Sequence, residues 1–141
     1  MKALVKWTGG LSFVGRGEGK HTVPMDASEE FGGTDGGARP AELLLIALGG
    51  CTGMDVISIL QKKRAKIDDF WLELSADKTD SQPKMLKDFK VKFVITGRGI
   101  KKIDVERAIE LSAEKYCTVG AMLKASTTVN YDFEIRETGA D

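Results

Sequence analysis

Apolar and polar residues alternate along several parts of the chain, which is the pattern of strands with one buried face. The clearest case runs from Phe89 to Ile95, where every second residue is aromatic or β-branched and Lys90 and Lys92 lie between them. The same period of two recurs near both ends of the sequence. The alternation predicts six strands, at residues 2–7, 11–14, 21–25, 70–75, 89–95 and 127–136.

The longest apolar stretch, Pro40 to Lys63, lacks this alternation and predicts one long helix. Pro40 suits the first helical position, where a missing N–H costs nothing. From Leu43 to Leu48 the residues are apolar on every side, so we expect this half to be buried all round. A single small domain has too few residues to surround this helix on all sides, so we expect a second subunit to cover part of the helix. Glycines and Asp55 interrupt the stretch, which we interpret as too short for a membrane span.

A second helix is predicted to begin near Asp104, a good N-cap residue, and to lead into Cys117. Its expected buried face holds Val105, Ala108, Ile109, Ser112 and Tyr116. Residues 26–39 are rich in glycine and acids and predict a mobile loop. The element order β-β-β-α-β-β-α-β indicates an α+β fold with antiparallel strands and a long buried central helix, in one domain spanning residues 1–141.

The balance of charges excludes some classes of partner. Lysine and arginine together number 21, as do aspartate and glutamate. There is therefore no basic field to attract nucleic acid. The N-terminus lacks the apolar core of a signal peptide, so we expect a cytoplasmic protein without a membrane partner.

The residue types that bind metals or phosphates are scarce or wrongly spaced. His21 is the single histidine, and the two cysteines lie 66 positions apart, which is not the spacing of a zinc site. The glycine-rich stretches match neither nucleotide-binding pattern, and no nucleophile elbow is present. We therefore predict no metal and no cofactor, and the thiols remain as the candidates for chemistry.

Cys51 lies in the middle of the long helix, close to three glycines. A lone cysteine in an apolar helix is usually a small core residue. Each glycine costs roughly 0.5–1 kcal/mol in a helix relative to alanine, so their presence indicates that something approaches the backbone closely. Cys117, the other cysteine, directly follows the second helix. These observations leave two roles open for the cysteines: inert burial in the core, or redox chemistry.

Two motifs give the chain a family resemblance. They are GGARPAELLLIALGGCTGMDV at 36–56 and YCTVGAMLKASTTVNYDFEI at 116–135, and with the element order they resemble the OsmC/Ohr family of osmotically inducible and organic hydroperoxide resistance proteins. The resemblance implies an intertwined homodimer with the long helices at its centre and two active sites at the interface. It also implies a thiol-dependent peroxidase acting on organic hydroperoxides in oxidative stress defence.

The resemblance assigns a role to each cysteine. Cys51 attacks the peroxide as a thiolate and becomes a sulfenic acid, and Cys117 condenses with it to a redox-active disulfide. A dithiol reductant, lipoyl or similar, restores both thiols.

The chain departs from the hydroperoxide resistance branch at two places, which is typical of a less characterised OsmC-like subgroup. Thr8 to Gly10 stand where that branch has an arginine, and Ala41 stands where it has a glutamate. Arg16 or Arg39 could supply the positive charge. Asp55 is four residues after Cys51 on the same helix face, and a carboxylate there opposes thiolate formation.

Two other functions fit the residues. One is a dimeric, non-enzymatic protein that binds a small apolar ligand beside the glycines, with both cysteines inert. The other is an acyl- or thiol-transfer enzyme that uses Cys51 alone.

Overall fold

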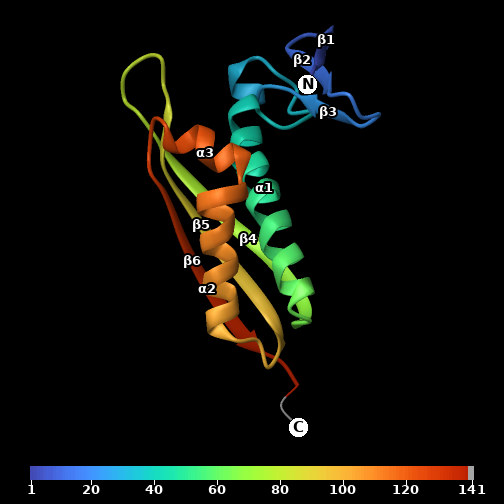
Figure 1. Ribbon diagram of the computed structural model, residues 1–141. Coiled ribbons are helices and arrows are strands. Elements are labelled where there is room, and N and C mark those ends of the chain that lie inside the picture. Colours follow the sequence, from blue (N-terminus) through green and yellow to red (C-terminus); the bar gives the residue numbers. More distant parts are fainter. Residues whose placement is uncertain (140–141) are drawn as a thin grey trace. The chain divides into compact units, whose positions relative to one another are not determined.

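A small antiparallel sheet begins the chain in the computed structural model, which describes residues 1–139 (Figure 1). Its strands are β1 (Leu4–Gly9), β2 (Ser12–Arg16) and β3 (Thr22–Met25), paired in that order. Gly9 and Gly10 form the first turn with φ angles of 118° and 54°, which glycine adopts without steric cost. The three strands predicted for this part of the chain are confirmed.

The segment after β3 is organised by the carboxylate of Asp26, which is buried. Ser12 Oγ, Thr34 Oγ1 and the Gly36 N–H donate hydrogen bonds to it, at 2.9, 2.6 and 3.1 Å. A short 3₁₀ turn, η1 (Glu29–Phe31), follows. Apart from this turn, residues 26–39 form a loop, as predicted, and the hydrogen bonds to Asp26 tie its glycine-rich part together.

The predicted long helix is present as α1 (Pro40–Lys62). Its buried residues are Leu48, Thr52, Gly53, Val56 and Leu60, which lie on one face. In the single chain Ile46 remains 59% exposed, so the burial of this half on every side, which was expected to need a second subunit, stays a prediction.

The helix is also continuous through its glycines. By length and composition its 23 residues would suffice to cross a membrane, contrary to the prediction from sequence. Core helices pass the same test, and Leu48, Val56 and Leu60 belong to the hydrophobic core.

A second sheet holds the long strands β4 (Lys66–Lys78), β5 (Leu86–Arg98) and β6 (Val129–Glu137), in that order. β4 and β5 are antiparallel, whereas β5 and β6 are parallel, with Phe93 opposite Phe133. The prediction of antiparallel strands throughout is wrong here. The reason is that the segment between β5 and β6 carries the chain back along the sheet, as a crossover between parallel strands must.

This crossover consists of α2 (Lys102–Leu111), the π-helical turn η2 (Ser112–Tyr116) and α3 (Thr118–Lys124). The sequence predicted one helix here, and α3 was missed. Lys101 rather than Asp104 is the N-cap of α2. Tyr116 was expected on the buried face but is 58% exposed, because a π-helical turn is wider than an α-helical one and shifts the faces that follow.

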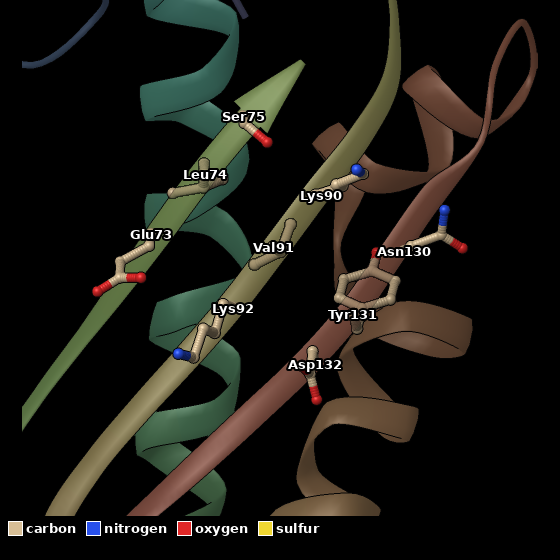
Figure 2. A pocket seen from close by; sticks show the side chains of 9 residues that line it. All are labelled: Glu73, Leu74, Ser75, Lys90, Val91, Lys92, Asn130, Tyr131 and Asp132. Carbon is tan, nitrogen blue, oxygen red and sulfur yellow. The ribbon is translucent and has the colours of Figure 1, made fainter. Parts of the chain in front are cut away.

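The long sheet has one apolar and one polar face, as the alternation predicted. Figure 2 shows Leu74, Val91 and Tyr131 in one row across the three strands, in the register of their pairing. The neighbouring row holds polar side chains. The core is built from α1, α2 and the apolar face of the sheet, and its fully buried members include Leu48, Val56, Leu60, Phe89, Val91, Phe93, Ile95, Val105 and Ala108.

Contacts divide the chain into two compact units, Met1–Leu44 and the part from Leu45 onward, with the boundary inside α1. A single domain over residues 1–141 stays a prediction, and residues 140–141 lie outside the described part.

Candidate active site

Both cysteines belong to the unit that begins at Leu45, and both are free thiols. Cys51 lies at the middle of α1 and is half-buried, whereas Cys117 is 3% exposed. Cys117 is held by its backbone, since its N–H donates to the Ser112 carbonyl at 2.9 Å. It also caps α3, because its Sγ accepts a hydrogen bond from the Gly120 N–H at 3.2 Å.

The two thiols are neighbours. Burial, followed by a hydrogen bond with the Cys51 side chain, raises the pKa of Cys117 from an ordinary 9.0 to about 11. The charges of Cys51 and Asp55 act in the same direction, and the Gly120 N–H acts against it. The structure thus brings together both residues that the sequence singled out, and it keeps Cys117 protonated at neutral pH.

A chain of three polar side chains connects α1 to the turn before Cys117. Ser112 Oγ donates to Asp55 Oδ2 at 2.8 Å, and it lies 2.9 Å from Thr52 Oγ1. A serine has one hydroxyl proton, and here Asp55 receives it, so Thr52 must be the donor in the second bond. Thr52 and Ser112 are fully buried. The chain fixes the turn that carries Cys117 against the helix that carries Cys51.

Tyr131 adds a hydroxyl group to this region. Its oxygen is buried and has no hydrogen-bond partner among the residues that the structure describes. Burial raises its pKa to about 12, and negative charge at Cys117 and Cys51 contributes to the shift. The alternation over residues 127–136 puts Tyr131 on the inward face of β6, with the side chains that pack against the core. One signal of a role for Tyr131 was present in the sequence: its hydroxyl is a polar group among the inward-facing valine, phenylalanine and isoleucine residues of this strand.

Both arginines named as possible activating groups, Arg16 and Arg39, belong to the unit Met1–Leu44. Arg39 forms ion pairs with Asp35 at 3.4 Å and Glu42 at 3.2 Å, all within the first unit. The cation close to the thiol region is Lys124, whose Nζ lies 5.1 Å from the centre of the Tyr131 ring. Its ammonium group donates to the Ala113 carbonyl at 2.8 Å.

Across residues 1–139, no group of three histidine, cysteine or acidic side chains is placed to hold a metal ion. A depression of ≈ 470 Å³ lies on the long sheet (Figure 2). Neither cysteine lines it; its lining residues are Glu73, Leu74, Ser75, Lys90, Val91, Lys92, Asn130, Tyr131 and Asp132. The thiol region is therefore the candidate active site.

Comparison with known proteins shows the family to which the chain belongs. A family model described as OsmC-like protein matches residues 33–132, a range that includes both cysteines. The chain belongs to the OsmC-like family. Protein YhfA of Escherichia coli (strain K12) is 37% identical over 135 residues, which are 96% of this chain and 98% of that protein.

Solved structures show the same OsmC-like fold. A hypothetical protein from Aquifex aeolicus VF5 matches with a TM-score of 0.85 and 28% identity, over 98% of this chain and 97% of that one. An organic hydroperoxide resistance protein from Elizabethkingia anophelis, with thiocyanate bound, matches with a TM-score of 0.70 and 14% identity, over 95% and 94%. At that identity the second likeness is one of fold alone.

Proposed function

We propose that this OsmC-like protein is a thiol-dependent peroxidase that reduces organic hydroperoxides and serves in oxidative stress defence. The observation that carries the proposal is the neighbouring position of Cys51 and Cys117, close enough for the Cys51 side chain to raise the pKa of Cys117, in a region with no metal cluster among the described residues. The family includes members named organic hydroperoxide resistance proteins, which adds support.

In the proposed reaction, the Cys51 thiolate attacks the peroxide R–O–O–H. A sulfur–oxygen bond forms, the O–O bond breaks, and the alkoxide takes up a proton to leave as R–OH. Cys51 is then a sulfenic acid. Cys117 attacks its sulfur, a disulfide forms, and water leaves. A dithiol such as a lipoyl group returns both sulfurs to thiols and is itself oxidised.

The different surroundings of the two thiols support this order of attack. Cys51 is the more exposed of the two, so it is the thiol that a hydroperoxide can reach. Cys117 is buried, and its raised pKa keeps it from competing as a thiolate. It needs to react only with a neighbour, and burial does not hinder that.

We also propose that the protein acts as an intertwined homodimer in the cytoplasm. Ile46 and Met54 on α1 are 59% and 72% exposed, with Gly50 halfway between them. Apolar side chains two helical turns apart form a stripe that a second copy could cover. Sedimentation tests this point: a dimer at micromolar concentration is expected, and a folded monomer under those conditions would exclude it.

The peroxidase proposal is tested by treating the reduced protein with one equivalent of an organic hydroperoxide. Two thiols should be lost and one intramolecular disulfide gained. Cys51→Ser should consume no peroxide. Cys117→Ser should react once and leave a sulfenic or over-oxidised Cys51.

The burial of Cys117 also favours a second candidate, a dimeric protein that binds a small apolar ligand and has inert cysteines. That candidate predicts no thiol loss with any hydroperoxide, and no reaction of either cysteine until the protein is unfolded. An acyl- or thiol-transfer enzyme would need Cys51 but would keep its activity in Cys117→Ser.

A further inference from the structure

Gly120 lies next to both the sulfur of Cys117 and the hydroxyl of Tyr131, where a side chain would crowd the two groups. A methyl group built on Gly120 would lie 3.2 Å from Cys117 Sγ and 3.4 Å from Tyr131 Oη. Gly120 is itself buried. The absent side chain therefore lets the sulfur and the hydroxyl both approach the Gly120 backbone closely.

The hydroxyl of Tyr131 is the unusual member of this group. It is buried and lacks a hydrogen-bond partner within residues 1–139. A buried polar group left unpaired costs about 1–3 kcal/mol. A phenylalanine at this position would avoid that cost, so a hydroxyl is understandable if it gains a partner during the reaction.

We infer that Tyr131 carries the proton in the resolving step, from the Cys117 thiol to the oxygen that leaves Cys51. This inference rests on the proposed peroxidase function. The Cys117 sulfur bonds to the Cys51 sulfur and loses its proton to the tyrosine oxygen. The tyrosine hydroxyl gives its own proton to the departing hydroxide. The sulfur–oxygen bond of the sulfenic acid breaks, water and a disulfide are formed, and Tyr131 ends as it began.

The surroundings of the two groups suit such an exchange. The pKa of Cys117 is raised to about 11 and that of Tyr131 to about 12, in both cases mainly by burial. A proton moves with little loss of free energy between groups whose pKa values are close. Cys117 is 3% exposed, so bulk water cannot readily take its proton, and a neighbouring hydroxyl is the available carrier.

The test separates the two steps of the reaction in Tyr131→Phe. The reduced protein is mixed with one equivalent of an organic hydroperoxide, and samples are quenched over time with a cyclic dione that captures sulfenic acid. Mass spectrometry then follows the sulfenic acid and the disulfide. We expect Cys51 to be oxidised at the wild-type rate, and the disulfide to form slower by on the order of 10²-fold, the lower range for proton-transfer catalysis. Sulfenic acid should accumulate.

Tyr116→Phe is the matched control, because Tyr116 is the other tyrosine of the chain and is exposed. It should form the disulfide at the wild-type rate. Gly120→Ala places a methyl group against both the sulfur and the hydroxyl but keeps the hydroxyl, and it should slow the second step as Tyr131→Phe does. Tyr131→Phe should melt no lower than wild type, since it removes an unpaired buried group.

The outcomes distinguish the inference from the function on which it rests. If wild type oxidises and forms the disulfide, but Tyr131→Phe forms it equally fast, the proton-carrier role is wrong and the peroxidase function stands. A slowing of both steps alike would also overturn the role, since it would indicate a general structural effect. If wild type loses no thiols, the peroxidase function fails and the inference fails with it.

Discussion

The hydroxyl of Ser112 donates a hydrogen bond of 2.8 Å to the carboxylate of Asp55, across 57 positions of sequence. The same hydroxyl accepts from Thr52, and the Ser112 carbonyl accepts from the N–H of Cys117. Ser112 thus joins the helix of one cysteine to the turn of the other. The position of Cys117 depends on a residue that has no redox chemistry of its own.

Ser112→Ala should lower the free energy of unfolding by about 1–3 kcal/mol, because the buried hydroxyl of Thr52 and the Asp55 carboxylate both lose a partner. Urea unfolding measures this change. Ser126→Ala, at an exposed position, is the control and should stay within about 0.5 kcal/mol of wild type. Equal stability of the two variants would mean that water replaces the serine without loss.

The raised pKa of Cys117 predicts a loss of stability at alkaline pH. The folded chain keeps this proton up to a pH of about 11, whereas the unfolded chain loses it near 9.0. The contribution is complete below the unfolded value and is lost as the pH rises through the folded one. Relative to Cys117→Ser, wild type should lose up to about 2–3 kcal/mol over this range. Unfolding curves for the two proteins that stay parallel from neutral to alkaline pH would contradict this.

The glycines around Cys51 should respond differently to leucine. A side chain on Gly49 would begin 2.9 Å from Leu74 Cδ1, and one on Gly53 would begin 3.3 Å from Leu72 Cδ1. Gly49→Leu and Gly53→Leu should therefore each cost about 1–3 kcal/mol of folding free energy by overpacking.

Gly50→Leu is the informative contrast, since nothing within residues 45–139 lies within 4 Å of the added carbon. It should preserve the fold of the chain but weaken the proposed dimer. Thermal unfolding and sedimentation together check this. A stable wild-type-like dimer of Gly50→Leu would show that Gly50 does not face the second copy.

Asp26→Asn should loosen residues 26–39. The hydrogen bond from Thr34, with those from Gly36, Ser12 and Ala27, holds the pKa of Asp26 well below its usual range, so wild type should keep this loop ordered in mild acid. The stabilisation of the loop by the Asp26 carboxylate is fully present above the unfolded pKa of 3.8. It is lost only as the pH falls through the lower pKa that Asp26 has in the folded chain. Limited proteolysis at neutral pH should cut the variant faster than wild type or Glu30→Gln. Identical digestion of all three proteins would contradict the role of Asp26.

The strands and their buried faces could be read from the sequence, but their direction could not. Phe93 and Phe133 face inward as the alternation predicted, because a period of two fixes the face of each residue. The same period of two does not indicate whether neighbouring strands run parallel or antiparallel. That depends on α2 and α3, and α3 was missed because the short segment with Gly120 has little helical pattern.

The site was predictable only in part. Cys51 and Cys117 stood out because the chain has no other thiols. Ser112 was visible as a hydroxyl on an otherwise apolar helix face, but its partner Asp55 could not be found, because pairing across separate elements depends on packing that a sequence does not display. For Asp55 the sequence suggested opposition to the thiolate, and the structure adds a hydrogen bond to Ser112.

Because the two cysteines are far apart in the sequence, a disulfide between them would change the stability of the fold. Cys51 lies in α1 before the long sheet, and Cys117 lies in the crossover just before its last strand, 66 positions later. A bond between them would close a loop that includes β4, β5 and α2. Closing a loop of this length would stabilise the fold by about 4 kcal/mol, through the lost freedom of the unfolded chain. A protease that samples unfolded molecules would then degrade reduced copies much faster, so the cellular lifetime of the protein would record its recent exposure to oxidant.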